Sequence, residues 1–312
     1  MNRKFGIELE ITGISKKKAL QALKAVGIKA VSENYNHTTQ KHWKIVPDGS
    51  VSDGFEVVSP ILKGEAGLEI AEIAARALED AGATANRSCG FHVHFDATGT
   101  SLETMKNIIR RYARFEEEID LFMPPSRRGN ENRYCQSMKE IIGRNFEEAS
   151  SIEKLIAVQK SRYYKVNLKS FQRHGTIESR QHSGTANATK ICEWIRFLAE
   201  FLDVCEKMEN ADQALSTSGL SKSSQKFLEL LSGDVPVSLE NVCEQLGWLH
   251  HTARSLLSRL RKKGYAIKSV KENGKTLYIF EGGSHEDSLW KGISKKIEMF
   301  YRRRAAVLAL TA

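Results

Sequence analysis

The sequence has no long apolar run, no closely spaced cysteine pair and no internal repeat. Its apolar stretches all fall short of the roughly 20 residues that a membrane-spanning helix needs. Residues 1–4 (MNRK) are not followed by the apolar core of a signal peptide. The five cysteines are scattered and odd in number. We therefore expect a cytoplasmic protein whose cysteines stay reduced and serve as small core residues.

The chain does have the composition of a soluble globular protein, with 41% apolar and 27% charged residues over 312 positions. Basic charge is concentrated near its end, because residues 221–312 hold 16 Lys and Arg against 9 Asp and Glu. A stretch rich in Ser, Thr, Gly and Asn precedes this part and is typical of a linker. We expect a first domain over residues 1–210, a linker over 211–224, a second domain over 225–283 and a basic helix over 284–312.

The first domain mixes helical and extended patterns. Apolar residues recur at helical spacing over residues 66–82, 101–122 and 189–209, and Gly82 suits the end of the first helix. Strand-like runs occupy residues 5–11, 42–47, 55–62, 90–96, 165–171 and 175–182. Two strands often follow each other without a helix between them, so we expect an α+β fold whose predominantly antiparallel sheet is packed by helices on one face.

The first predicted strand, in the sequence FGIELEITG, carries two glutamates on one face. Side chains alternate across a strand, so Glu8 and Glu10 project from the side opposite the apolar residues. A strand with one face in water gives this pattern, and so does a carboxylate pair that holds a cation. This segment alone leaves both interpretations open.

Three further strands carry polar residues at the same spacing. GFHVHFD places His92 and His94 on one face, FEVVSPIL contains Glu56, and GTIESRQH brings Glu178 and Arg180 together. Four carboxylates with one or two imidazoles suit Mg²⁺ or Mn²⁺ better than Zn²⁺, which disfavours an HxH metalloenzyme of the cupin type. An arginine beside such a set favours phosphate, whose oxygens its planar fork can bind. The set predicts phosphoryl transfer from a nucleotide.

Five motifs in register carry a family resemblance. GIELE, PDGS followed by FEVVSP, GFHVHFD, PPSRRGNENRYC and GTIESRQHSGT together resemble the amidoligase family. This family is a phage- and bacterium-associated branch of the glutamine-synthetase-like carboxylate–amine ligases. The resemblance covers residues 4–205 and implies a glutamine-synthetase-like sheet.

The resemblance also implies roles for individual residues. The carboxylates that would hold two divalent ions, Mg²⁺ or Mn²⁺, are Glu8, Glu10, Glu56 and Glu178. One of His92 and His94 would be a metal ligand and the other would lie near substrate or nucleotide phosphate; we assign the metal to His92 and the nucleotide to His94. Arg180 matches the arginine that contacts the transferred phosphoryl group.

The remaining matches lie in two loops. A basic segment similar to the family's, which could hold substrate carboxylate or phosphate, contains Arg127, Arg128 and Arg133. Asp48 and Ser50 match a turn whose role is structural or substrate-positioning. Each has a simpler alternative, because Arg127 and Arg128 could be solvated loop residues and an Asp-Gly pair favours a plain hairpin turn. We expect His174 and His182 to be surface or packing residues rather than ligands.

The implied reaction has two steps. ATP would phosphorylate a carboxylate to an acyl phosphate, and an amine would then attack to give an amide, ADP and phosphate. Neither the carboxylate nor the amine can be named from the sequence. The oligomeric state is equally open, although related synthetases form rings and a homo-oligomer is compatible with the resemblance.

Residues 221–283 predict a second small domain. SSQKFLELLSG, SLENVCEQLG and HTARSLLSRLRKKG read as three helices, and a hairpin with its tip at residues 272–275 follows them. This order resembles a winged helix-turn-helix domain, in which the last helix enters the major groove and the wing touches phosphates. The resemblance implies nucleic-acid contacts by Arg254, Arg259, Arg261, Lys262, Lys263 and Lys275. A helix-turn-helix that contacts protein is the alternative.

Two functions from different classes follow. The first is an ATP-dependent amide-forming ligase that its second domain targets to nucleic acid. The second is a DNA-binding regulator whose ligase-like domain senses a ligand without turnover. A pure sensor has no need of so complete a set of carboxylates, which favours the ligase.

Overall fold

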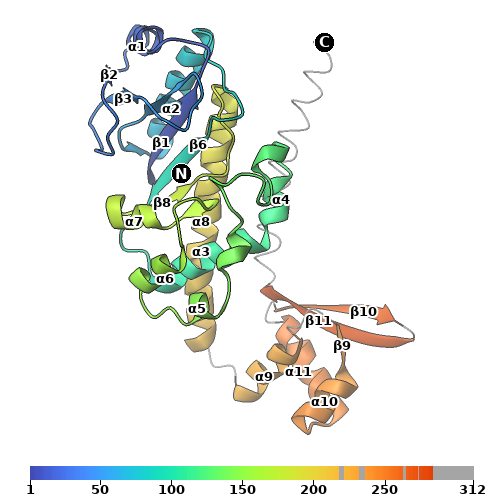
Figure 1. The fold of residues 1–312 in the computed structure, drawn as a ribbon. Coiled ribbons are helices and arrows are strands. Elements are labelled where there is room, and N and C mark those ends of the chain that lie inside the picture. The colour runs from blue at the N-terminus through green and yellow to red at the C-terminus, as the bar shows by residue number, and fades with distance from the viewer. Residues whose placement is uncertain (218–220, 232–235, 263–264, 273, 284–312) are drawn as a thin grey trace. The chain divides into compact units, whose positions relative to one another are not determined.

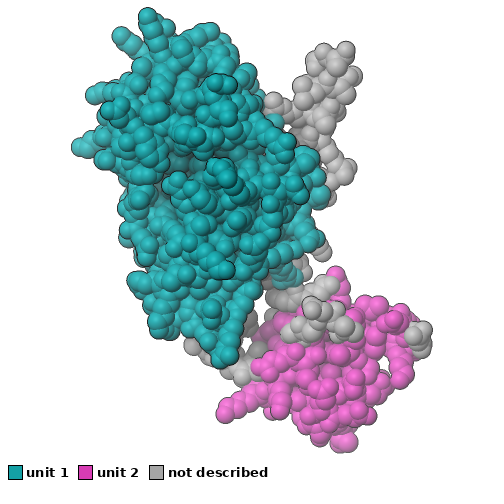
Figure 2. All heavy atoms as spheres, viewed as in Figure 1, with its two compact units in different colours: residues 1–205, 303–312 teal, residues 206–302 magenta. Residues whose placement is uncertain are grey.

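The computed structural model describes residues 1–217, 221–231, 236–262, 265–272 and 274–283. The chain divides into two compact units, which Figure 2 shows in different colours. The described part of unit 1 is residues 1–205, and unit 2 begins at Glu206. Each unit has its own sheet and is described by itself.

Unit 1 is built on an eight-stranded sheet (Figure 1). Its path runs β2-β3-β4-β1-β6-β8-β7, and β5 pairs with β1. The pair β2–β3 is parallel and the other pairs are antiparallel, so the sheet is mixed and the α+β class is confirmed. The strands are β1 (Lys4–Ile11), β2 (Ala30–Ser32), β3 (Trp43–Val46), β4 (Phe55–Val58), β5 (Leu62–Lys63), β6 (Phe91–Asp96), β7 (Val166–Asn167) and β8 (Thr176–Ser179).

The long helix α8 packs on the apolar side of this sheet, whereas α7 lines a pocket on the polar side. Alternation sends Phe5, Ile7 and Leu9 of β1 to one face, where they are buried. On the same side, the ring of His182 lies between Phe91 of β6 and Trp194 of the long helix α8. The helices are α1 (Lys16–Ala25), α2 (Gly64–Asp80), α3 (Leu102–Arg114), α4 (Glu116–Asp120), α5 (Arg144–Glu147), α6 (Ile152–Val158), α7 (Lys169–His174) and α8 (Ala188–Thr217), with 3₁₀ turns η1 (Pro125–Arg127) and η2 (Met138–Ile141). The opposite face of the sheet carries the polar residues.

Three predicted elements differ clearly from the observed ones. The strand predicted over residues 55–62 divides into β4, which ends at Val58, and β5, which begins at Leu62. The strand predicted over residues 165–171 ends at Asn167, whose side-chain oxygen accepts a hydrogen bond from the amide of Lys169 and starts helix α7. The helix predicted over residues 101–122 is interrupted at Phe115, which is not helical, and so divides into α3 and α4. Gly82, whose φ of 89° is in the left-handed region, follows α2 as expected near a helix end.

Unit 2 consists of helices followed by a hairpin. Its elements are α9 (Lys222–Leu231), β9 (Val237–Ser238), α10 (Leu239–Leu246), α11 (His250–Lys262), β10 (Tyr265–Glu272) and β11 (Lys275–Gly283). The predicted hairpin tip is confirmed, since Glu272 pairs with Lys275. Gly247 ends α10 in the left-handed conformation (φ 66°) and makes the turn into α11. Helix α8 continues to Thr217, within the predicted linker. Lys263 and the helix predicted over residues 284–312 lie outside the described residues.

Candidate active site

The register of the sheet gathers the predicted polar residues on one face. Across the pair β1–β4, Glu10 lies opposite Glu56. Across β1–β6, Glu8 lies opposite His92, and across β6–β8, His94 lies opposite Glu178. Directly opposite residues project to the same side of a sheet. The alternating pattern of each strand therefore becomes one polar surface that crosses four strands.

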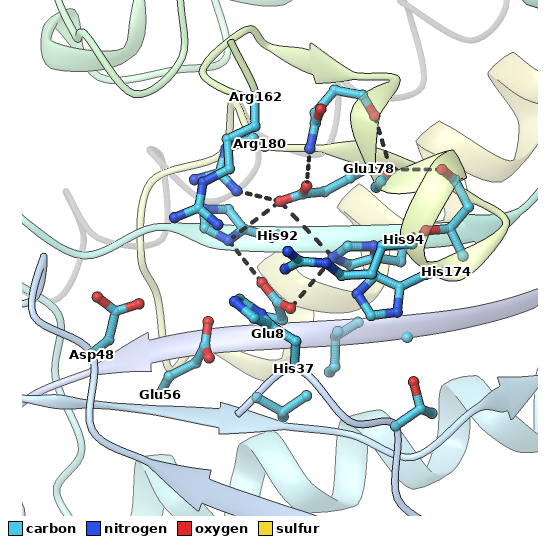
Figure 3. A pocket seen from close by; sticks show the side chains of 18 of the residues that line it. Glu8, His37, Asp48, Glu56, His92, His94, Arg162, His174, Glu178 and Arg180 are labelled. Carbon is cyan, nitrogen blue, oxygen red and sulfur yellow. Dashed lines mark hydrogen bonds and ion pairs between the residues drawn. The ribbon is translucent and has the colours of Figure 1, made fainter. Parts of the chain in front are cut away.

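Four of these side chains form a ring of contacts (Figure 3). The Nδ1 atom of His92 lies 3.1 Å from Glu8 Oε2 and 3.8 Å from Glu178 Oε1. The Nε2 atom of His94 lies 3.4 Å from Glu8 Oε1 and 3.9 Å from Glu178 Oε1. Two carboxylates and two imidazoles thus alternate around a small space.

Glu10 extends this ring towards β4 and the start of β6. It accepts a hydrogen bond from the amide of Gly90, and its Oε1 lies 4.0 Å from Nε2 of His92. A Cβ atom at residue 90 would lie 2.7 Å from that same Nε2 atom, so glycine is required here to leave the imidazole in place.

Burial and mutual repulsion shape the charges of the site. Burial, together with the neighbouring carboxylates Glu8 and Glu10, raises the pKa of Glu56 well above its ordinary value. Burial alone would also raise the pKa of Glu8, but the neighbouring imidazole of His94 holds it well below the ordinary value. The opposite balance holds for His94, whose pKa is raised because the charges of Glu178 and Glu8 outweigh its burial.

These residues fit divalent cations. Their ligand atoms form three overlapping groups, each within 4.8 Å: Glu8 with Glu56 and His92, Glu8 with His94 and Glu178, and Glu10 with Asp48 and Glu56. The Nε2 atom of His94 is buried and has no hydrogen-bond partner in the described part of the chain. An oxygen-rich donor set with an imidazole nitrogen among its carboxylates is what Mg²⁺ or Mn²⁺ would use.

Arg180 is held at the edge of this donor set. Its guanidinium donates to Glu178, and its amide donates to the carbonyl of Lys165 at 2.8 Å. The second carboxylate oxygen of Glu178 accepts from the side chain of Asn167 at 2.6 Å. Burial alone would lower the pKa of Arg180, but Glu178 and Glu8 raise it, which secures the positive charge. Arg180 is thus fixed as a cation beside the carboxylates.

The three loop arginines are placed differently. Arg127 is 3% exposed, lines the same pocket and donates to the carbonyl of Cys89 at 2.5 Å. Arg128 is exposed, outside the pocket lining, and donates to the carbonyl of Met123. Arg133 is also exposed and lies over the ring of Tyr134, which itself lines the pocket. The structure therefore brings Arg127 to the carboxylates and leaves the other two outside.

Comparison with known families decides the identity of unit 1. A family model described as "Putative amidoligase enzyme" matches residues 1–202. The chain belongs to the amidoligase family. No curated protein matches the sequence. Among the described residues, no helix combines the length and apolar character needed to cross a membrane.

Within the amidoligase domain, the DGS motif forms a turn at the pocket. The carboxylate of Asp48 accepts hydrogen bonds from the amide of Ser50 at 2.7 Å and from its hydroxyl at 2.6 Å. These hydrogen bonds make an Asx turn. Asp48 also belongs to one of the three cation groups, so it adds a carboxylate to those predicted for metal.

The amidoligase pocket also contains residues that sequence reasoning missed. Its volume is about 1480 Å³, and its lining includes Lys44, Arg162, Tyr163 and the loop of residues 35–39. Lys44 is 3% exposed and donates to the carbonyls of Asn36 and Thr38 and to the side chain of Asn36. Arg162, Tyr163 and residues 35–39 lie outside any strand, whereas Lys44 lies in β3 opposite Val58 and therefore on the face that carries Glu8.

The two histidines predicted not to be ligands have separate environments. His182 is buried among aromatic rings, and burial lowers its pKa to about 4. His174 lines the amidoligase pocket, with its ring centroid 6.1 Å from that of His94. The prediction that all cysteines are buried and free is confirmed.

The amidoligase match ends before unit 2, where the predicted nucleic-acid residues lie. Arg254, Arg259 and Lys262 are exposed on α11, and Lys275 is exposed at the hairpin tip. Arg261 is engaged within the unit, because its guanidinium donates to the carbonyl of Ile267 at 2.7 and 2.9 Å and lies over the ring of Tyr278. Three exposed cations on α11 and one at the tip are thus available to a ligand.

Proposed function

We propose that this member of the amidoligase family is an ATP-dependent carboxylate–amine ligase that works through an acyl phosphate. The observation that supports this most is the register-aligned surface of Glu8, Glu10, Glu56 and Glu178, with Arg180 held at its edge. Four neighbouring carboxylates repel one another unless cations bind between them. Divalent cations also bind the polyphosphate of a nucleotide, so that such a site suits ATP.

The acidic residues would hold the metal ions. Glu8, Glu10, Glu56, Glu178 and His92 are the ligands we assign, and Asp48 and His94 complete the three groups. When bound, Mg²⁺ or Mn²⁺ supplies positive charge that neutralises the phosphoryl oxygens during transfer. Arg180 would add a guanidinium that binds the transferred group bidentately, and the Glu178 carboxylate orients it.

The proposed reaction has two steps. A substrate carboxylate oxygen attacks the γ-phosphorus of ATP, so that an O–P bond forms, the bond to the β-phosphate oxygen breaks and ADP leaves. The amine nitrogen then attacks the acyl carbon, a C–N bond forms, phosphate leaves and the amine releases a proton. Arg180 and Arg127 would stabilise the charge that develops on the phosphoryl oxygens. We place this reaction in the cytoplasm, where ATP is present and the five free cysteines would stay reduced.

Hydroxylamine as a surrogate amine tests this proposal. Wild-type protein, Mg²⁺, ATP and pooled carboxylates should give hydroxamate together with ADP. Glu10→Gln and Arg180→Ala should each lower the rate by about a hundredfold or more, whereas Glu69→Gln, an exposed change on α2, should leave it unchanged. A wild type that neither binds ATP nor releases ADP would instead support a regulator that senses a ligand without turnover.

We further propose that unit 2 is a winged helix-turn-helix domain that targets the ligase to nucleic acid. The order of three helices and a hairpin supports this, together with the exposed cations of α11 and Lys275 at the tip. A cation at the tip is suited to the phosphate contacts that a wing makes.

A further inference from the structure

One wall of the catalytic pocket carries a row of cations. Lys160 and Arg162 come from the segment before β7, and Lys169 and Arg173 from helix α7. All four line the pocket. Lys169 and Arg173 are one helical turn apart and therefore lie on the same side of α7. The wall of residues 160–174 is thus strongly basic, whereas the floor of the pocket is acidic.

These four cations have no carboxylate within ion-pair distance among the described residues. Other basic side chains of unit 1 do have such partners. Arg110 pairs with Glu103 at 2.6 Å and also with Glu147, and Lys139 pairs with Glu117 at 2.6 Å. Arg162 lies over the ring of Tyr163, but four like charges on one short segment without a carboxylate partner repel one another. A ligand of opposite charge would remove this repulsion.

The opposite wall is not acidic and is firmly held. It is the loop of residues 33–42, whose carbonyls at Asn36 and Thr38 accept hydrogen bonds from Lys44. The only carboxylate of this loop, Glu33, is paired with His42 at 2.8 Å. In Figure 3, His37 of this loop lies on the Glu8 side of the pocket and Arg162 lies on the Glu178 side. The described residues of the 33–42 loop therefore add no unpaired carboxylate that would repel a negatively charged ligand at the 160–174 wall.

The pocket is also larger than one nucleotide requires. Its volume is about 1480 Å³, whereas pockets for small molecules hold about 300–1,000 Å³. A second substrate of considerable size can therefore lie beside ATP. The four cations of the wall line the same pocket as Arg180 and Arg127, the two arginines that we assign to the transferred phosphoryl group.

We propose that the 160–174 wall binds the acid substrate and that this substrate is an acidic peptide, in which the reacting carboxylate is one of several. This inference rests on the proposed function, because the reaction consumes a carboxylate. Aspartate and glutamate side chains provide both that group and the neighbouring negative charges that four cations would bind. Nucleic acid matches the charge of the wall but has no carboxylate to activate.

Peptide binding to the full chain, measured without ATP, tests the assignment. Fluorescein-labelled octa-glutamate is titrated at low ionic strength and followed by anisotropy, beside an octapeptide with one glutamate among serines and glycines. The wall variant is Arg162→Gln with Arg173→Gln. The matched control is Arg76→Gln with Arg144→Gln, which removes two exposed arginines outside the pocket.

We expect wild type and control to bind octa-glutamate with equal affinity and the wall variant to bind it about tenfold more weakly. With octa-glutamate as acceptor in the hydroxamate reaction, the same variant should raise KM and leave kcat unchanged. Equal octa-glutamate affinity in all three proteins would overturn the assignment. So would a wall variant that loses affinity for a DNA duplex but not for octa-glutamate.

Failure of the ligase proposal gives a different result. A wild type that forms no hydroxamate but binds octa-glutamate through the wall would refute turnover and retain the wall as an acidic-peptide site. Hydroxamate formation from small acids, with octa-glutamate binding that is unaffected by the wall variant, would retain the ligase and refute the acidic-peptide substrate.

Discussion

At the scale of single residues, Glu56 is the carboxylate whose repulsion a bound cation would relieve most directly. It is 7% exposed and shares its surroundings with Glu8, Glu10 and Asp48, and burial with these carboxylates raises its pKa. A metal ion at either of its two cation groups would offset this repulsion. We expect MnCl₂ to raise the melting temperature of the wild type. A free ion concentration of 100 times Kd stabilises a protein by about 2.7 kcal/mol.

Glu56→Gln removes one ligand and one repelled charge together. The variant should melt above wild type in EDTA and should lose most of the stabilisation by MnCl₂, whereas Glu69→Gln should behave as wild type. Calorimetric melting of unit 1 in EDTA and in MnCl₂ measures both effects. An equal response of wild type and Glu56→Gln to Mn²⁺ would remove Glu56 from the ligand set.

His182 makes the stability of unit 1 depend on pH. Burial lowers its pKa to about 4, against about 6.5 in an unfolded chain. Between these values the unfolded chain binds a proton at His182 and the folded chain does not, so the free energy of unfolding falls as pH falls. From pH 7.5 to pH 5 this contribution amounts to about 2 kcal/mol. Below about pH 4 it causes no further loss.

His182→Asn isolates this contribution. The Nδ1 atom of His182 donates to the carbonyl of Ser183 at 2.7 Å, and the asparagine amide can make the same bond without titrating. Urea denaturation followed by hydrogen exchange of unit 1 should show a smaller pH dependence for the variant, by about 2 kcal/mol between pH 7.5 and 5. The same pH dependence in both proteins would mean that other groups cause it.

The single residues most open to prediction were those in strands. Glu8, Glu10, His92 and His94 follow a period of two in the sequence, and in the structure they lie in strands β1 and β6, where that period places them on one face. Arg162 could not be found in this way, because its proximity to the site depends on a loop path that no local pattern encodes. Lys44 does follow the period of two, since it lies in β3 between Trp43 and Ile45 and projects to the face of Glu8. Arg261 has the charge expected of a residue that contacts nucleic acid, but in the folded unit 2 its guanidinium donates to the carbonyl of Ile267.

At the scale of elements, a buried charge network connects α4 to the strands of the site. The ammonium group of Lys165 is fully buried and donates to Glu116 at 2.9 Å and Asp120 at 2.6 Å. Asp120 also accepts from Gln181 at 2.5 Å, and the backbone of Lys165 accepts from the amide of Arg180. The network thus fixes the position of the Arg180 backbone relative to α4.

Lys165→Met should destabilise unit 1 strongly. It leaves two buried carboxylates without their cation, which costs about 3–5 kcal/mol. The control is Lys139→Met, which breaks an exposed pair with Glu117 and should cost less than about 1 kcal/mol. Urea denaturation of unit 1 measures both. If the two variants lose similar free energies of unfolding, the buried Lys165 network contributes no more to stability than the exposed pair does.

Elements whose pattern is long and periodic were predicted well, and short ones were not. The strand β1 and the helix α2 have many positions that agree with one period. Helix α7 has only six residues, and its start depends on one hydrogen bond from the Lys169 amide to Asn167. Register is a further element-scale property that the sequence does not encode locally, since it results from how all eight strands pair.

At the scale of the whole molecule, the two functions that we propose lie in parts of the chain with different charge. The amidoligase match covers residues 1–202, whereas the basic excess lies in residues 221–312. Proposed catalysis and proposed targeting therefore depend on separate sets of residues. Substitutions that remove cations from α11 should leave hydroxamate formation unchanged.

DNA binding by the full chain tests this division. If α11 enters a groove, log K should fall linearly with log salt, by about 0.9 for each phosphate contact. Arg254→Gln with Arg259→Gln should reduce this slope by about 2. Arg261→Gln is the matched control, because its guanidinium is already bound to the Ile267 carbonyl and its loss should lower the melting temperature of unit 2 without changing the slope. If the double variant shows the same salt dependence of log K as wild type, α11 contacts protein rather than DNA. If Arg261→Gln alone lowers the salt dependence, this arginine leaves Ile267 and contacts phosphate.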